Sequence, residues 1–234
     1  MNQWIGAKGN AQAQTEAEKE AIYQLRYQVY IEELGKEFDR IDHENKRLVD
    51  ALDGVGKTIL FYAKKEDEII GTVRLNIGTA DQFPQKYRDV YKLDFFQQYQ
   101  PEQPILAVGS RMFISAPYRK GKLYVKLIWA LITELLEQRI PFLFLNSSPE
   151  ISHLYTGLGA IFIREEGFTD DGVGYQMPML WMPGNIEHLQ ESRSVLYPLV
   201  KRMNPDVAAY QWFCEHNPGQ APKNPTGMNH LQRT

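Results

Sequence analysis

The order in which strand-like and helix-like segments follow one another limits the possible folds of this chain more than any other feature of the sequence. Residues 105–115 form a long run of strand-forming residues, and residues 122–139 place apolar residues at helical spacing until Pro141 prevents the helix from continuing. A short basic turn joins the two segments. Such a strand–turn–helix unit predicts a sheet with a helix packed on one of its faces.

The N-terminal part predicts a helix followed by a hairpin. Thr15 and Glu18 have the spacing of a capping box, and apolar residues recur at helical spacing from there to Gly35, a residue type that commonly ends helices. Two strand-like runs, residues 58–64 and 68–75, are separated by three polar residues and predict an antiparallel pair.

The C-terminal part adds further helices and strands. Ser148 is expected to cap a short helix that has Pro149 at its first position. The other expected elements are a short helix near residues 90–99, strands at 142–145, 160–164 and 175–182, and two helices within residues 184–217. The whole order predicts an α/β (α+β) fold, with a mixed central sheet flanked by helices and a C-terminal helical appendage.

Length and composition set the class of protein. Of the 234 residues, 43% are hydrophobic and 24% are charged, which is ordinary for a folded globular protein. The length allows one large domain or two small ones, and the order of elements favours one. We therefore expect a flexible arm at residues 1–14, a single domain at 15–183, a helical extension at 184–217 packed on that domain, and a disordered tail at 218–234.

Charge and cysteine content argue against several classes of function. The formal net charge of -3 gives no general attraction to nucleic acid, so no nucleic-acid partner is expected. The single cysteine, Cys214, excludes an internal disulfide and a cysteine-based zinc site, and no metal site is predicted. Residues 1–14 lack a secretory signal and no segment is apolar enough to cross a bilayer, so a cytoplasmic location is expected.

The basic turn before residue 123 is the first candidate site. A turn that opens a helix presents free backbone N–H groups, which bind phosphates. Its residues resemble the pyrophosphate-binding motif of the GNAT acyltransferase superfamily, although Lys122 and Tyr124 stand where that motif has glycines. The resemblance implies that the turn binds the donor, and the alternative is a solvated basic loop. The expected donor-binding residues are Arg119, Lys120, Gly121, Lys122 and Leu123.

A second landmark lies at residues 154–159, which read Leu-Tyr-Thr-Gly-Leu-Gly. It resembles the closing signature of the same superfamily, an aromatic residue on a short helix before a Leu-Gly turn. The resemblance implies that Tyr155 protonates the leaving thiolate, a suitable task for a phenol with a pKa near 10 beside a thiol with a pKa near 8.5. The alternative is a core aromatic residue whose hydroxyl bonds to a neighbour.

Four further motifs resemble the acyl-homoserine-lactone (autoinducer) synthases and, more closely, the N-acyl amino acid synthases. The resemblance covers roughly residues 20–182 and rests on the order of the motifs. It implies transfer of an acyl group, expected to be fatty acyl, from an acyl carrier protein or CoA thioester to the amine of an amino acid or similar small molecule. No permanently bound cofactor is expected. The motifs are residues 25–30, 50–53, 71–75 and 110–113.

The charged residues of these motifs form a predicted acceptor site. Arg26 lies on the apolar face of its helix and therefore needs a carboxylate, and Asp50 and Asp53 come from the long polar loop at residues 36–56. Arginines in two neighbouring apolar strands could clamp the carboxylate of the acceptor, or the same charges could only tie the loop down. The predicted substrate-binding residues are Arg26, Arg74, Arg111 and Ser110.

The base that takes the proton of the amine is left open by the sequence. Autoinducer synthases have a glutamate three residues before the strand arginine, and here Val108 occupies that position. Asp50, Asp53 and Glu44 are the carboxylates that could replace it. His43 could titrate near neutral pH, but a lone loop histidine is more often a surface residue.

The donor is expected to be a medium or long acyl chain on an acyl carrier protein. The basic turn has few glycines to close around a CoA pyrophosphate, but its positive charges suit the acidic surface of a carrier. Three other functions stay open: acyl-homoserine-lactone synthesis, ordinary acetylation from acetyl-CoA, and an inactive module that only binds. The side chains expected to line an acyl tunnel, or else to fill the core, are Leu123, Leu127, Leu131, Phe142 and Phe144.

Overall fold

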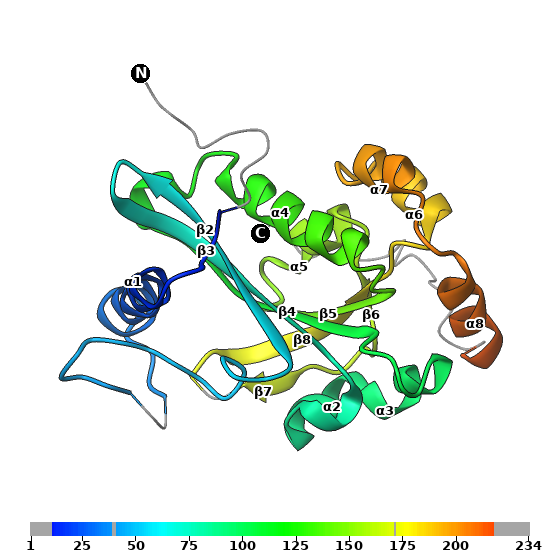
Figure 1. Cartoon of the computed structure of the whole chain (residues 1–234), viewed down its shortest axis with the longest axis horizontal. Coiled ribbons are helices and arrows are strands. Elements are labelled where there is room, and N and C mark those ends of the chain that lie inside the picture. Colours follow the sequence, from blue (N-terminus) through cyan, green and yellow to red (C-terminus); the bar gives the residue numbers. More distant parts are fainter. Residues whose placement is uncertain (1–10, 39–40, 171, 218–234) are drawn as a thin grey trace, which may run out of the picture.

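The computed structural model describes residues 11–38, 41–170 and 172–217 (Figure 1). Its strands form a mixed sheet with the order β1-β2-β3-β4-β5-β8-β6, and β7 pairs with β8 off this path. Strands β4 and β5 run parallel, whereas the other paired strands are antiparallel. The strands are β1 (Ala11–Gln12), β2 (Lys57–Lys65), β3 (Glu68–Gly78), β4 (Leu106–Ile114), β5 (Phe142–Ser147), β6 (Ile161–Phe162), β7 (Phe168–Asp170) and β8 (Gly174–Trp181).

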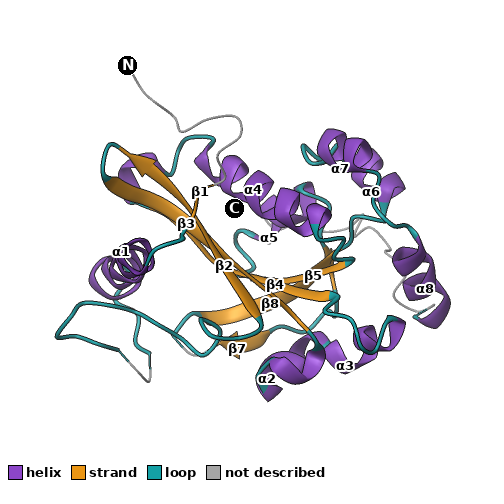
Figure 2. Ribbon diagram, in the orientation of Figure 1, coloured by secondary structure: helices purple, strands orange, loops and turns teal. Residues whose placement is uncertain are grey.

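Helices cover both faces of this sheet (Figure 2). In Figure 1, α4 lies above the sheet, while α2 and α3 lie below it. The arrangement is the predicted mixed sheet with flanking helices and a helical C-terminal extension. The helices are α1 (Glu16–Tyr27), α2 (Gln85–Tyr91), α3 (Leu93–Phe96), α4 (Leu123–Glu137), α5 (Ser152–Gly157), α6 (Ile186–Glu191), α7 (Tyr197–Met203) and α8 (Ala208–His216).

The two faces of the sheet bury separate hydrophobic clusters. On one face, Leu143 and Leu145 of β5 pack with residues of α4, α6 and α7. On the opposite face, Phe142 and Phe144 of the same strand pack with residues of α2, α3 and α8. Because helices cover both faces, the central strands are apolar on both sides and lack the alternation of a half-exposed strand.

The first helix begins at the predicted capping box. The Thr15 hydroxyl accepts a hydrogen bond from the Glu18 N–H at 3.2 Å, and the Glu18 carboxylate accepts one from the Thr15 N–H at 3.0 Å. After α1 the helix widens into a π-helical segment, η1 (Gln28–Glu33). Gly35 then adopts a φ of +59°, as expected of a glycine that ends a helix. This continuous helix carries Arg26 and Tyr30 to the sheet.

The structure corrects the predicted short helix at Ser148. Residues 148–151 form a turn in which the Ile151 N–H donates to the Ser148 carbonyl at 3.2 Å, and α5 begins only at Ser152. The turn leaves Pro149 outside the helix.

Two helix counts also differ from the prediction. The single helix expected near residues 90–99 is replaced by α2 and α3, which Lys92 separates with a φ of +54°. The C-terminal extension has three helices instead of two, since Asn204, with a φ of +47°, ends α7 before α8 begins. Val195 and Val207, which lie within the segment predicted to form the two helices, are outside the observed helices and are exposed.

The ends of the chain were predicted to be flexible. Residues 11–12, part of the expected arm, form β1 and pair with β2, while residues 1–10 and the predicted tail at 218–234 lie outside the described residues. Of the helices in the described part of the chain, none has the length and apolar character needed to span a membrane. Within the same part, no group of three or more His, Cys, Asp or Glu side chains is placed to hold a metal ion, and Cys214 is a free, half-buried thiol.

Candidate functional site

The site lies where two neighbouring strands separate. β4 and β5 pair from Leu106 with Phe142 as far as Gly109 with Leu145, and beyond that point β4 follows β3 while β5 follows β8. The edge of β4 after Gly109 therefore directs its backbone N–H and C=O groups into an opening instead of a ladder with β5. A cavity of about 570 Å³ occupies this opening.

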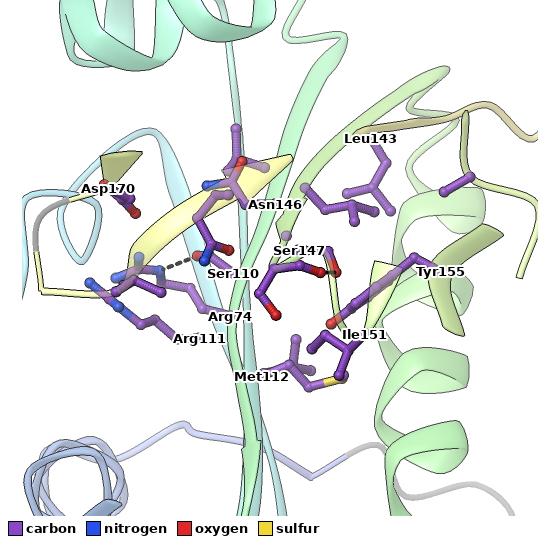
Figure 3. Close-up of a pocket in the computed structure, with 18 of the residues that line it drawn as sticks. Arg74, Ser110, Arg111, Met112, Leu143, Asn146, Ser147, Ile151, Tyr155 and Asp170 are labelled. Carbon is purple, nitrogen blue, oxygen red and sulfur yellow. Dashed lines mark hydrogen bonds between the residues drawn. The ribbon is translucent and has the colours of Figure 1, made fainter. Parts of the chain in front are cut away.

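The cavity has two chemically different ends, which we call the polar end and the apolar end. Figure 3 shows Asp170, Arg74 and Arg111 on one side of the opening, and Leu143, Ile151 and Tyr155 on the other. The polar end lies on the face of the sheet that carries α2, and the apolar end lies on the α4 face. The polar end is lined by Arg74, Tyr87, Ser110, Arg111, Asn146 and Asp170, and the apolar end by Ile128, Leu131, Ile132, Leu143, Leu158, Trp181 and Leu196.

A buried ion-pair network supports the polar end. Arg26 Nη1 lies 2.7 Å from Asp53 Oδ2, and Arg74 Nη1 lies 2.6 Å from Asp50 Oδ1 and 2.7 Å from Asp53 Oδ1. Both guanidinium groups are almost fully buried. The predicted pairing of Arg26 with the acidic loop is therefore present, because a guanidinium inside the protein requires a carboxylate.

Arg74 uses its donors within the protein. Besides Asp50 and Asp53, its Nε donates to the Ser110 hydroxyl at 3.0 Å, the bond drawn in Figure 3. Arg74 and Ser110 were predicted to bind the substrate with Arg111. Arg74 holds the acidic loop against β3 and β4, the alternative that the sequence left open, and it also lines the cavity, so its contact with substrate stays a prediction.

Arg111 occupies a strained position that directs it toward the cavity. The register of β3 and β4 shifts between Thr72 and Arg74, so β4 has one extra residue there, and Arg111 adopts a φ of +52°. Such a bulge re-aims a side chain, and a positive φ is uncommon for residues other than glycine. Arg111 Nε donates to Asp50 Oδ2 at 2.5 Å, and its Cζ lies 5.2 Å from the ring centroids of both Tyr30 and Phe38. The guanidinium is thus held at the cavity wall by one carboxylate and two aromatic rings.

None of the three carboxylates predicted as bases is placed to act as one. Burial alone would raise the pKa of Asp50, but the guanidinium groups of Arg74 and Arg111 outweigh burial and hold that pKa well below its usual range. Asp53 is buried against Arg26 and Arg74. Glu44 is exposed in a turn and does not line the cavity. A general base must both reach the substrate and be able to accept a proton from it, and none of these three residues meets both conditions.

His43 lies next to Glu44 in the same exposed turn. Its Nδ1 is 2.9 Å from the Tyr27 hydroxyl, and the two rings meet edge to face. The histidine contributes no atom to the cavity wall. His43 is therefore a surface residue, as is usual for a lone histidine in a loop.

Tyr155 lies on α5 and extends into the opening from the side opposite Arg74 and Arg111 (Figure 3). Burial raises the pKa of Tyr155 to about 12. Its hydroxyl therefore stays protonated at neutral pH and can donate a hydrogen bond. With a pKa this far above that of a thiol, hydrogen bonding to a leaving sulfur is favoured over complete proton transfer.

Asn146 and Asp170 are among the polar residues of the cavity that the sequence did not predict. Asn146, near the end of β5, accepts a hydrogen bond from the Tyr91 hydroxyl on its side-chain oxygen, which turns its amide nitrogen away from Tyr91. Burial raises the pKa of Tyr91 well above its ordinary value, so the tyrosine remains the donor. Asp170 is the last residue of β7, and its Oδ1 lies 2.9 Å from Lys86 Nζ on α2. The only signal available was the position of each at a strand end.

The basic turn is folded as a helix entry, with Lys120, Gly121 and Lys122 exposed. Arg119 is also exposed but is held at the surface, since its Nε donates to the Ile114 carbonyl at 2.8 Å and its guanidinium pairs with Glu33. Leu123 is buried in the core cluster beside α4. Of the five predicted donor-binding residues, four are therefore exposed to solvent, and none lines the cavity.

The predicted acyl tunnel is corrected in its membership. Leu131 lines the apolar end, but Leu123 and Leu127 pack in the core without reaching the cavity. Phe142 and Phe144 point to the opposite face of the sheet, where they pack with α3. Their place is taken by Leu143 and Leu145, because successive residues of a strand point to opposite faces.

Comparisons with known proteins agree with this geometry. Residues 25–130 match the sequence family described as acetyltransferase (GNAT) domain, and no curated protein matches the sequence significantly. The N-acyl amino acid synthase FeeM from uncultured soil microbes is 15% identical, with 80% of this chain and 95% of that chain covered and a TM-score of 0.58. The CoA-dependent acyl-homoserine lactone synthase BjaI is 16% identical, with coverage of 84% and 91% and a TM-score of 0.57. An acyl-CoA N-acyltransferase from Pseudomonas aeruginosa is 18% identical, with coverage of 71% and 91% and a TM-score of 0.52. At these identities the likeness shows a shared fold, and the predicted GNAT-like fold is confirmed.

Proposed function

We propose that this GNAT-fold protein is an N-acyltransferase that moves a medium or long acyl group from a thioester to the amine of an amino acid or similar small molecule. The observation that carries the proposal is the cavity between β4 and β5, which joins an apolar end to a polar end. A thioester carbonyl in the opening would have its hydrocarbon chain at the apolar end and an amine nucleophile at the polar end.

The groups at the opening suit attack on a thioester. Backbone N–H groups on the free edge of β4 after Gly109 can donate to the carbonyl oxygen as it gains negative charge. Tyr155 projects toward the same place and can donate a hydrogen bond to the leaving sulfur. The remaining contribution is alignment of the two reactants, which converts a bimolecular step into one within a complex.

The acceptor is proposed to carry a carboxylate that binds Arg111. The Arg111 guanidinium lines the cavity, and its Nε donates a hydrogen bond to Asp50. The donors of Arg74, in contrast, are directed at Asp50, Asp53 and Ser110. A guanidinium fork binds a carboxylate bidentately, which favours an amino acid over a simple amine.

The donor is proposed to be an acyl carrier protein or CoA thioester with a long chain. Lys120 and Lys122 are exposed at the entry of α4, where they can meet the phosphate of a pantetheine arm or the acidic surface of a carrier. The apolar end of the cavity is lined by apolar side chains from α4, β5, β8 and the segments around them, an environment that an acetyl group would leave largely unfilled.

The test is a product assay with mixed amino acids and matched acetyl, octanoyl and palmitoyl donors, each on CoA and on a carrier protein. Amides are identified by mass spectrometry and the released thiol is followed in parallel. We expect long-chain N-acyl amino acids, with rates that increase with chain length up to a limit. Preference for acetyl-CoA, a lactone product from S-adenosylmethionine, or binding without thiol release would each contradict the proposal.

A further inference from the structure

Val108 stands where autoinducer synthases have a glutamate and cannot accept a proton, and the structure points to another residue for this task. We infer that Asp170 binds the acceptor's amine and accepts its proton as the new bond to carbon forms. This inference rests on the proposed function and adds to it a specific residue and a class of acceptor.

Elimination among the carboxylates leads to Asp170. Within the described residues, two carboxylates line the cavity, Asp170 and Glu150. Glu150 is exposed in the turn before α5, whereas the side chain of Asp170 is 14% exposed and lies at the polar end. Asp50 and Asp53 are committed to arginines. Asp170 is therefore the partly buried carboxylate available to a molecule at the polar end.

The position of Asp170 is set from two sides. β7 pairs with β8 through Asp170 and Gly174, which places the carboxylate at the end of a short hairpin. Lys86 Nζ on α2 lies 2.9 Å from Asp170 Oδ1 and holds the side chain against the cavity wall. Other titratable and charged groups of the cavity wall on this side are Arg74, Arg111, Tyr87, Tyr91 and Lys36, whose Nζ donates to the Val173 carbonyl at 3.3 Å. Burial together with the Asp170 charge raises the pKa of Tyr87 to about 12.

Asp170 and Arg111 together define the charge pattern of the acceptor. A carboxylate and a guanidinium on the same side of one opening are complementary to a molecule that has both an amine and a carboxylate (Figure 3). The acceptor class is therefore a zwitterionic amino acid, with its carboxylate at Arg111 and its amine at Asp170.

The proton balance of the step is complete. The ammonium of the zwitterion first loses one proton to solvent, which leaves a neutral amine. The amine nitrogen then forms a bond to the thioester carbon and, as it becomes acidic, loses a second proton to the Asp170 carboxylate. The C–S bond breaks, and the thiolate leaves with a hydrogen bond from Tyr155 and takes a proton from solvent. Asp170 then returns its proton to solvent. The products are an amide and a free thiol, and no oxidant or reductant takes part.

The experiment compares three variants with two nucleophiles. Asp170→Asn removes the base, Lys86→Gln removes its ion-pair partner, and Glu150→Gln removes the other carboxylate of the cavity. Each variant is assayed with the amino acid that the native protein prefers and with hydroxylamine. Hydroxylamine is uncharged at pH 7, and because it is a weaker base than the amine of an amino acid, its nitrogen can give its proton to water as the bond to carbon forms. The ratio of the two rates is measured within each variant, so the fraction of correctly folded protein cancels.

We expect Asp170→Asn to lower kcat/KM for the amino acid by roughly 100-fold or more, and to lower the hydroxylamine rate by less than about tenfold. Glu150→Gln should keep the ratio of the two rates within about threefold of the native value, whereas Lys86→Gln, which removes the contact that positions Asp170, should lower the ratio by less than Asp170→Asn does. Asp170→Glu should restore part of the lost rate. Equal losses for both nucleophiles in Asp170→Asn, or the same change of ratio in Glu150→Gln, would overturn the inference.

The proposed function has its own readout in the same experiment. If the native protein forms amides with amino acids but Asp170→Asn is unaffected, only the inference fails. If the native protein forms no amide with any amino acid, the proposed function fails and the inference fails with it.

Discussion

The two ends of the cavity are built in opposite ways. At the polar end, each charged side chain is held by specific partners from distant parts of the chain, as when Asp50 in the loop meets Arg74 on β3 and Arg111 on β4. At the apolar end, side chains such as Leu131, Leu143 and Leu196 are held by packing alone. The polar end therefore depends on a few exact partners, and the apolar end depends on the volume that many side chains fill.

This difference has an energetic consequence. Removing one partner of a buried ion pair leaves an uncompensated charge and costs about 3–5 kcal/mol. Removing a methylene from a cavity wall changes the free energy of a bound chain by about 0.8 kcal/mol. Single substitutions should thus abolish the function of the polar end but only adjust the apolar end.

The largest effect is expected at Asp50. Asp50→Asn leaves Arg74 and Arg111 without their shared carboxylate, and we expect the free energy of unfolding to fall by about 3–5 kcal/mol. Denaturant unfolding measures this change. The matched control is Asp42→Asn, because Asp42 lies in the same loop but bonds to Asn45 near the surface. A loss at Asp42 as large as that at Asp50 would remove the distinction between the two ends.

The same carboxylate sets a pH dependence. The pKa of Asp50 is lower in the folded protein than in the unfolded chain, so its stabilisation is fully present above the unfolded pKa of about 3.9 and is lost as pH falls through the folded pKa. We expect the native protein to lose stability below about pH 4, and Asp50→Asn to show a shallower slope there. Unfolding curves between neutral and acid pH test this, and identical slopes would contradict it.

The next effect concerns Arg111 and acts on the substrate. Arg111→Gln should raise KM for the amino acid acceptor by an amount equivalent to about 2–5 kcal/mol, while thioester binding changes little. Arg74→Gln should chiefly lower stability, because Arg74 bonds to Asp50, Asp53 and Ser110. Steady-state kinetics and unfolding are measured for both variants. Loss of acceptor affinity in Arg74→Gln with unchanged stability would reverse these assignments.

A smaller loss is expected at the junction of the two ends. Tyr155→Phe removes a hydrogen-bond donor from the leaving sulfur, and kcat should fall by an amount equivalent to about 1.5–3 kcal/mol with little change in KM for the donor. Since burial raises the pKa of Tyr155 to about 12, its protonation should cause no change in rate between pH 7 and 9. A tyrosine-dependent change of rate in that range, absent from Tyr155→Phe, would argue against this role.

The smallest effect is expected at the apolar end. Leu131 lines the cavity and Leu127, one turn earlier on α4, does not. Leu131→Val should shift the preferred acyl chain toward greater length, by about fourfold in relative kcat/KM per added methylene, because each buried methylene contributes about 0.8 kcal/mol. Leu127→Val should lower the free energy of unfolding by a similar amount without changing the preferred chain length. A shift of chain preference in both variants would contradict the assignment of Leu131, but not Leu127, to the cavity wall.

Local features of the fold were predictable where one segment contains its own signal. The capping box at Thr15, the turn between β2 and β3, and the apolar spacing of α4 are each set within a few residues. The start of α5 was predicted wrongly, since a serine followed by proline suits a turn as well as a helix cap. Local signals decide an element when the competing structures differ in energy over that segment alone.

In the candidate site, too, some features could be predicted from local sequence and others depended on the tertiary structure. The sequence alone determined that Arg26 needs a carboxylate, because the cost of a buried charge does not depend on the details of the fold. It also determined that β5 is apolar on both faces. Only the tertiary structure decided that Leu143 and Leu145, not Phe142 and Phe144, face the α4 side, since both faces are covered and alternation cannot tell them apart.

The place of Asp170 at the polar end was also decided only by the tertiary structure. Asp170 ends a strand of three residues that carries too little pattern to be predicted, and Lys86 and Arg111, which share its surroundings, are distant from it in sequence. Residues 25–30, 50–53 and 110–113 could be assigned to one charged site because they resemble, in the same order, motifs of known acyltransferase families, and because Arg26 on the apolar face of its helix requires a carboxylate. The sequence gives no reason to expect that Asp170 is buried, because a short polar segment is stable in solvent. Its place at the cavity is set only by the pairing of β7 with β8 and by the packing of α2.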